Sequence, residues 1–152
     1  EGTNHPTSEK EVHRQIYLRR EDAGMIIHAH TKKAMAVSVR KIREVPCLVE
    51  EMSQLIGGGI PITPQYVPAE QHFQLGTAAA ENIGNRNGVI LRNHGPVAVG
   101  RNPEEAVLMV EVIEKACEIF LDQGQMFYAP IPQCYIDSER YRYLYKYGNE
   151  KT

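Results

Sequence analysis

The amino-acid sequence predicts one domain of the α/β class, with α+β as the alternative. Short apolar segments typical of strands alternate along the chain with segments of helical periodicity. The chain has 152 residues, which suits one ordinary domain and leaves no room for two substantial cores. Hydrophobic residues make up 42% of the sequence and charged residues 24%, which is the usual composition of a globular protein.

The first predicted helix begins within residues 6–11. Thr7 or Ser8 can accept hydrogen bonds from its first amides, and acidic residues occupy its first turn. Its inward face is predicted to contain Val12, Ile16 and Tyr17.

Strands and helices then alternate as far as residue 100. Glycine, proline and the change of period mark their limits. In chain order we expect a buried strand over 24–30, a helix capped by Thr31 and running through 34–37, and a short strand over 45–49. A flexible glycine- and proline-rich connection around 57–68 then leads to a helix over 70–83 that ends near Gly84. Paired strands over 89–91 and 97–100, joined by a turn at 93–96, complete this part of the chain.

The strongest helical signal runs from Asn102 to Gln123. Asn102 is the predicted N-cap, Pro103 takes the first helical position, Glu105 completes a pattern like a capping box, and Gly124 ends the helix. The predicted apolar face consists of Ala106, Met109, Val110, Ile113, Ala116, Cys117 and Phe120. The tyrosine-rich tail that follows has no clear period, and we predict no element there.

Charge, hydropathy and cysteine content exclude several classes of protein. A formal net charge of -2 gives no general attraction to nucleic acid or acidic lipid. No apolar run approaches the ~20 residues of a membrane-spanning helix, and no secretory signal is visible. The scattered Cys47, Cys117 and Cys134 suit neither a disulfide scaffold nor a cysteine-based zinc site. We therefore expect a cytoplasmic protein that binds neither nucleic acid nor membrane.

Three histidines are the most informative residues. His28 and His30 are two apart on a predicted strand, so both side chains point to the same face and can converge on one ion. His94 follows another apolar strand, in a turn where Gly95 allows close backbone packing or a positive φ. Three histidines with an open fourth position are typical of catalytic zinc sites. The alternative is that the pair is hydrogen-bonded or exposed at a strand end and that His94 is only a turn residue.

A second candidate site lies at the start of the first helix. The hydroxyls of Thr7 and Ser8, with the free amides of the helix start, favour binding of an anion such as phosphate. The alternative is an ordinary helix cap in which Glu9 only complements the helix dipole. The triple glycine at 57–59 lacks the lysine and hydroxyl residue that end a P-loop, so we interpret it as a flexible connection.

The order of these motifs resembles the class II aldolase family, which includes the fuculose-1-phosphate aldolases and, as relatives, the ribulose-5-phosphate epimerases. The likeness runs from Pro6 to about Phe120. It is carried by residues 6–9, His13 and Tyr17, residues 26–30, residues 91–95 and the long glutamate-bearing helix.

The resemblance implies a three-layer α/β/α fold around a mixed sheet, with the metal site at the sheet edge and homotetramers as the common assembly. It also implies that His28, His30 and His94 bind Zn²⁺ or another divalent metal. Glu9 corresponds to the acidic residue that serves as metal ligand and catalytic acid/base. Thr7 and Ser8 correspond to residues that contact the substrate phosphate.

Two departures from the family pattern affect these expectations. The Gly/Asn-rich N-terminal part of the family domain is missing, so we expect residues 1–152 to form a domain incomplete at its N-terminus. The position at which fuculose aldolases carry a catalytic tyrosine is Glu50 or Glu51 here. A tyrosine of the tail is an alternative source of that group.

The predicted function is a zinc-dependent lyase of carbohydrate metabolism. It would cleave a phosphorylated ketose, such as fuculose 1-phosphate, by a retro-aldol reaction through an enediolate. The expected ligand is a small phosphorylated sugar. The alternatives are an epimerase, a dehydratase or a decarboxylase on the same scaffold, or a non-catalytic interaction module like adducin.

Overall fold

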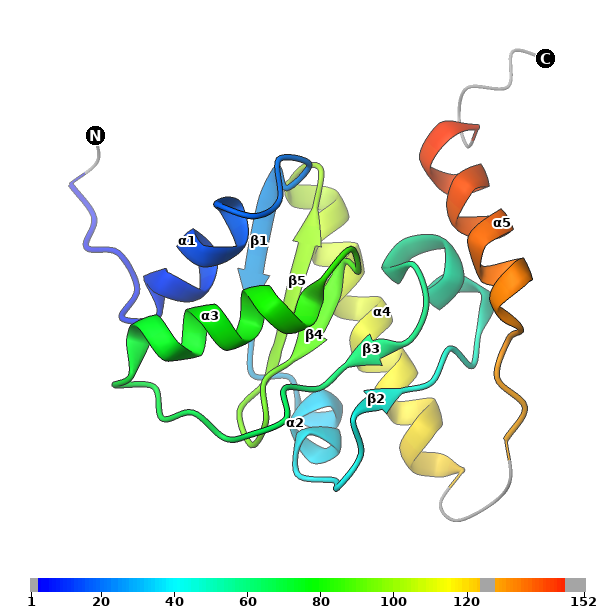
Figure 1. The fold of residues 1–152 in the computed structure, drawn as a ribbon, viewed down its shortest axis with the longest axis horizontal. Helices are drawn as coiled ribbons and strands as arrows, with labels where there is room; N and C mark the ends of the chain where they lie inside the picture. Colours follow the sequence, from blue (N-terminus) through cyan, green and yellow to red (C-terminus); the bar gives the residue numbers. More distant parts are fainter. Residues whose placement is uncertain (1–2, 124–127, 147–152) are drawn as a thin grey trace.

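A small antiparallel sheet forms the centre of the protein (Figure 1). The computed structural model describes residues 3–123 and 128–146. The sheet contains β1 (Met25–His28), β5 (Pro96–Gly100) and β4 (Gly88–Ile90) in that spatial order. Both neighbouring pairs are antiparallel. This arrangement confirms the predicted pairing of the two strands on either side of the turn at 93–96.

A second antiparallel pair extends this arrangement. It consists of β2 (Glu44–Val45) and β3 (Ile60–Pro61). A parallel bridge between Ile62 and Ile90 joins the pair to the edge strand β4. Antiparallel and parallel pairing therefore occur together, as expected for a mixed sheet.

Helices cover both faces of the sheet and give the three predicted layers. On one face lie α1 (Lys10–Tyr17) and α3 (His72–Ile83), packed against each other. On the other lie α2 (Lys32–Ser38) and α4 (Pro103–Asp122), with α4 crossing β5 and β1. The helix α5 (Gln133–Tyr145) packs on a π-helix, η1 (Met52–Ile56), beside these layers.

Side chains of the central strand β5 alternate between two hydrophobic clusters. Val97 and Val99 pack with the residues of α1 and α3, whereas Ala98 packs with those of α2 and α4. Both faces of this strand are buried, because a helical layer covers each one. Its continuous apolar sequence follows from this burial.

The first helix begins inside the predicted range of residues 6–11, but its predicted cap is wrong. The helix α1 begins at Lys10, because the backbone first forms a turn in which the Thr7 hydroxyl accepts a hydrogen bond from the Glu9 amide (3.3 Å). Neither Thr7 nor Ser8 is the N-cap residue; that position belongs to Glu9. Tyr17 is 42% exposed, and the buried polar residue of the inward face is Gln15.

The predicted cap of the second helix is also corrected. Thr31 holds the N-cap position of α2, but its side chain makes no capping hydrogen bond. The Glu114 carboxylate of α4 accepts the amides of Lys33 (2.8 Å) and Ala34 (3.0 Å) instead. This contact ties the start of α2 to α4.

The long helix α4 agrees closely with its prediction. The Asn102 side chain accepts the Glu105 amide at 2.8 Å, and Pro103 takes the first helical position. The Glu105 carboxylate accepts from Arg101, rather than from the Asn102 amide that a capping box requires. The predicted stop at Gly124 lies outside the described residues.

Three other predictions need revision. The strand expected over 45–49 is limited to Glu44–Val45, and the connection expected around 57–68 is preceded by η1 and contains β3. The tail, for which the sequence predicts no element, contains α5 over Gln133–Tyr145.

Cys47, Cys117 and Cys134 are free thiols. No helix in the described ranges, 3–123 and 128–146, is long and apolar enough to span a membrane.

Candidate metal centre

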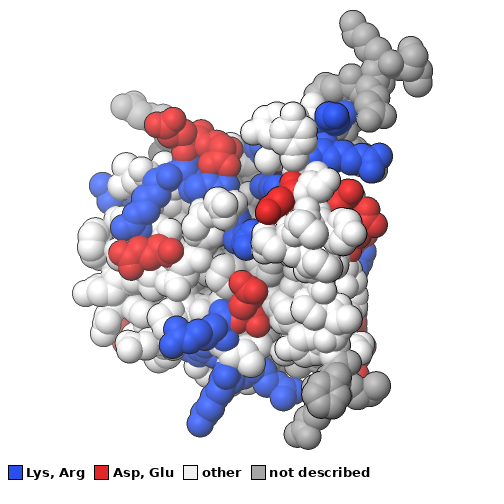
Figure 2. Space-filling model, turned by 45° about the vertical axis from the view of Figure 1, so that its right-hand side comes forward, with Lys and Arg blue, Asp and Glu red and all other residues white. Residues whose placement is uncertain are grey.

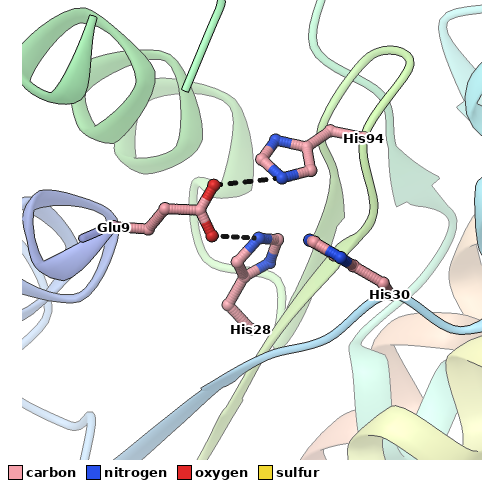
Figure 3. A group of neighbouring side chains, drawn as sticks. All are labelled: Glu9, His28, His30 and His94. Carbon is pink, nitrogen blue, oxygen red and sulfur yellow. Dashed lines mark ion pairs between the residues drawn. The ribbon is translucent and has the colours of Figure 1, made fainter. Parts of the chain in front are cut away.

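Four side chains from three separate segments converge at one end of the sheet (Figure 3). Glu9 comes from the turn before α1, His28 and His30 from the end of β1 and the residues after it, and His94 from the turn between β4 and β5. One potential ligand atom from each of the four lies within 4.8 Å of the others. The three predicted histidines and Glu9 are thus brought together by the fold.

The pairing of β1 with β5 places the histidines beside one another. His28 stands opposite Val97, and the Ala29 amide donates to the Pro96 carbonyl oxygen at 3.1 Å. The turn that carries His94 packs so tightly here that a Cβ on Gly95 would lie 2.3 Å from the Ala29 carbonyl oxygen. The positive φ in this turn belongs to Asn93 (55°) and not to Gly95, whose role is close packing.

The packing of α1 on α3 brings Glu9 to the histidines. Val12 and Ile16 are completely buried on the inner face of α1. Opposite them, a Cβ on Gly76 would lie 2.4 Å from the Glu11 carbonyl oxygen, so the two helices approach each other closely. The position of Glu9, just before α1, therefore depends on this helix contact.

One hydrogen bond fixes the tautomer of His28. Its Nδ1 lies 2.9 Å from the Pro96 carbonyl oxygen, which can only accept, so Nδ1 carries the proton. In the neutral imidazole, Nε2 then has a free lone pair. Metal-binding histidines are commonly oriented by such a hydrogen bond from their second nitrogen.

The free nitrogen of His28 faces a carboxylate. Its Nε2 lies 3.1 Å from Glu9 Oε2, and His94 Nε2 lies 3.1 Å from Glu9 Oε1. Among the residues that the structure describes, His28 Nε2 is buried without a hydrogen-bond partner. Two acceptor atoms at this separation repel each other unless a proton or a cation lies between them. The arrangement therefore suits a shared positive charge.

Burial favours the neutral form of His28 and His94. Desolvation lowers the pKa of His28, although the hydrogen bond to Pro96 and the charge of Glu9 act in the opposite direction. Desolvation also lowers the pKa of His94, against the attraction of Glu9. Neutral imidazoles are the form that binds metal. The donor set of three imidazoles and one carboxylate suits Zn²⁺ and related divalent ions.

The dimensions of the cluster are close to those of a metal site. A tetrahedral ion with bonds of about 2.0–2.1 Å holds its ligand atoms about 3.3 Å apart. The two Glu9–histidine distances of 3.1 Å match this value. The three imidazole rings are 4.9–5.1 Å apart between centroids. With all four potential ligand atoms within 4.8 Å of one another, these residues can surround one divalent ion.

A cleft of about 330 Å³ opens beside the cluster. Its lining consists of Thr7, Glu9, His13, His28, Ala29 and His30. Of the two predicted phosphate-binding residues, Thr7 lines this cleft, whereas Ser8 is exposed and does not. His13 also lines this cleft. Its spacing of four from Glu9, one helical turn along α1, is the signal that places it in the cleft.

Burial lowers the pKa of His13, and the charge of Glu9 partly offsets this shift.

Glu50 and Glu51, the candidates for the position at which fuculose aldolases carry a catalytic tyrosine, lie outside this cleft. Glu51 pairs with Lys115 at 2.7 Å, and Glu50 accepts from Gln54 at 3.1 Å. Neither glutamate lines the cleft.

Comparison with solved structures shows the same fold in sugar-phosphate enzymes. An L-fuculose 1-phosphate aldolase superposes with a TM-score of 0.86 at 25% identity, over 95% of this chain and 67% of that one. The L-fuculose-1-phosphate aldolase of Thermus thermophilus gives 0.62 at 27% identity, over 80% and 64%. YgbL of Klebsiella pneumoniae, described as an aldolase, epimerase or decarboxylase, gives 0.77 at 23% identity, over 90% and 67%. The chain thus spans about two thirds of these proteins.

A family-level comparison agrees with the structural one. The sequence pattern of the class II aldolase and adducin N-terminal domain matches residues 1–121. This match covers the cluster of Glu9, His28, His30 and His94 and both faces of the sheet. The chain belongs to the class II aldolase and adducin N-terminal domain family.

Proposed function

We propose that the protein is a divalent-metal-dependent aldolase, a lyase that cleaves a phosphorylated ketose by a retro-aldol reaction. His28, His30 and His94 would hold the metal, with Zn²⁺ as the first choice, and Glu9 would be the catalytic acid/base. Residues 1–152 would belong to a class II aldolase-like domain of a homo-oligomer located in the cytoplasm. Structural similarity to L-fuculose-1-phosphate aldolases at 25% and 27% identity supports this substrate class.

One observation carries the proposal. His28 Nε2 is buried 3.1 Å from a carboxylate oxygen of Glu9, and no hydrogen-bond partner for it lies within residues 3–123 and 128–146. The Pro96 carbonyl prevents this nitrogen from carrying the proton of the neutral ring. A bound divalent ion satisfies both groups and would polarise the carbonyl of the substrate as a Lewis acid.

The side chains of this chain would then divide the remaining work. Glu9 would move a proton at the carbon beside the substrate carbonyl, because its carboxylate lies at the cleft. Thr7 and Ser8, with the positive end of α1, would hold the substrate phosphate. Fixing the phosphate fixes the distance from the reacting carbon to Glu9.

The test is the replacement of Glu9 by glutamine. Glu9→Gln keeps the shape and one oxygen but cannot cycle a proton, so we expect turnover to fall about 10²–10⁴-fold. The histidines should still bind most of the metal. Glu11→Gln is the matched control, since Glu11 lies on the same helix but bonds to Gln15 and Arg14.

The measurement is the rate of fuculose 1-phosphate cleavage, recorded together with bound zinc. Full activity of Glu9→Gln would assign proton transfer to another group, with His13 as the next candidate in the cleft. Loss of metal together with activity would make Glu9 chiefly a ligand.

A further inference from the structure

A second cavity lies apart from the metal centre. It has a volume of about 620 Å³, larger than the cleft beside His28, and shares no lining residue with it. Its walls are α5, the turn after α3 and the end of η1. Figure 2 shows the side of the molecule that carries α5, with basic and acidic side chains next to one another beside that helix. Arg20, Arg86 and Arg140 bring positive charge to the cavity.

The guanidinium group of Arg20 donates its hydrogen bonds to other residues of the protein. Nε and Nη2 of Arg20 donate to the Asp22 carboxylate, each at 2.6 Å. Nη1 donates to the carbonyl oxygens of Gly84 and Arg86, and Nη2 also donates to Asn87. Arg20 therefore holds the turn after α3, and its charge is balanced by Asp22.

The other two arginines lie against a pair of glycines. Gly57 and Gly58 have φ angles of 91° and 136°. A Cβ on Gly57 would lie 3.2 Å from Arg140 Nε, and a Cβ on Gly58 would lie 2.6 Å from Arg86 Cζ. Because neither glycine has a side chain, both guanidinium groups pack on adjacent residues of one backbone segment. The glycine-rich segment thus contacts the guanidinium groups of both Arg86 and Arg140.

Both guanidinium groups retain hydrogen-bond donors. Arg140 Nη1 donates to the carbonyl oxygens of Gln54 (2.7 Å) and Leu55 (2.8 Å), and Arg86 Nη1 donates to that of Gly57. Within residues 3–123 and 128–146, no group accepts from Nε or Nη2 of either arginine, and no carboxylate forms an ion pair with them. Burial lowers the pKa of Arg140, and the nearby groups Tyr143, Glu105 and Asp22 act in the opposite direction.

The α5 wall of the cavity also carries aromatic side chains. Tyr141 and Tyr145 of α5 lie with their ring centroids 4.9 Å apart and are 56% and 62% exposed. Asp137 also lines the cavity, and its carboxylate accepts from Gln133. Exposed rings provide an apolar surface for a sugar ring, and a carboxylate can accept a sugar hydroxyl.

We propose that this cavity binds a small phosphorylated sugar, with the phosphate on Arg86 and Arg140 and the sugar against Tyr141 and Tyr145. Guanidinium groups match phosphate oxygens in geometry and charge. The volume also lies in the usual range for small-molecule sites, about 300–1,000 Å³. The site is separate from the metal centre and does not rest on its function.

Calorimetric titration with ribose 5-phosphate tests the proposal. Arg140→Gln keeps a donor for the carbonyls of η1 but removes the charge, and we expect its affinity to be at least tenfold weaker than that of the wild type. The matched control is Arg142→Gln, which lies on the same helix outside the cavity and should bind within twofold of the wild type. Equal affinity of Arg140→Gln and wild type would overturn the proposal.

Two further measurements separate this site from the metal centre and from folding defects. Affinity for ribose 5-phosphate should be unchanged in His28→Ala treated with a chelator; loss of binding there would place the probe at the metal centre and overturn the proposal. In the wild type, the Nε–H NMR signals of Arg86 and Arg140 should shift with inorganic phosphate and with ribose 5-phosphate but not with ribose. Unshifted signals would overturn the proposal even if Arg140→Gln failed to fold.

Discussion

At the scale of single residues, the metal centre depends on the direction of one hydrogen bond. The bond from His28 Nδ1 to the Pro96 carbonyl oxygen leaves Nε2 free toward Glu9. The His-x-His spacing predicts that His28 and His30 share a face. It does not predict the tautomer, because the acceptor belongs to a residue 68 positions away. Glu9 and His94 were predictable from their local motifs, whereas their contact required the fold.

The protonation of the buried histidines gives a prediction at this scale. Burial disfavours the imidazolium, so in the metal-free protein His28 and His94 should titrate with midpoints below 6.5, the ordinary value. The charge of Glu9 opposes this shift, so Glu9→Gln should lower both midpoints further. Histidine Cε1–H NMR signals followed from pH 8 to 4 provide the measurement. Midpoints at or above 6.5, or midpoints that rise in Glu9→Gln, would contradict the account.

At the scale of elements, the site depends on helices packed from outside it. The helix α1 reaches the histidines because Gly76 of α3 allows close contact with the Glu11 backbone. The helix α2 starts where Glu114 of α4 accepts its amides. Helical periodicity predicts α4 well, since one long face of it is buried. The helix α5 has only one buried residue, Ile136, so its sequence shows no apolar stripe by which it could be predicted.

The substitution Gly76→Ala, which adds one methyl group, tests the contact between α1 and α3. In Gly76→Ala the added Cβ would lie 2.4 Å from the Glu11 carbonyl oxygen, so α1 must move away. We expect a loss of about 1–3 kcal/mol of unfolding free energy, as for other overpacked sites. We also expect weaker zinc binding, because Glu9 moves with the helix. Gln74→Ala, on the exposed side of α3, is the control.

Chemical denaturation and zinc titration of the two variants provide the measurement. Zinc affinity equal to that of the wild type in a destabilised Gly76→Ala would show that the position of Glu9 does not depend on this contact.

At the scale of the whole molecule, the metal centre joins segments that are far apart in the sequence. Its residues come from position 9, from positions 28 and 30, and from position 94. They belong to the layer of α1 and to two sheet segments, so a bound ion would link a helical layer to the sheet. The fold class was predictable from the interleaved elements, and the three-layer architecture from the family resemblance. The limits of the short strand β2, and the existence of β3, were not predictable, because two residues each carry no periodic signal.

The most direct test of the central claim, that these four residues bind one divalent ion, is thermal unfolding with and without Zn²⁺. An ion that binds only the folded protein at 100 times its Kd adds about 2.7 kcal/mol of stability. For a domain of this size, this corresponds to an increase in Tm of about 5–10 °C. The account predicts this increase for the wild type and for His72→Ala, an exposed histidine outside the cluster, and none for His28→Ala. An equal increase in His28→Ala, or none in the wild type, would contradict it.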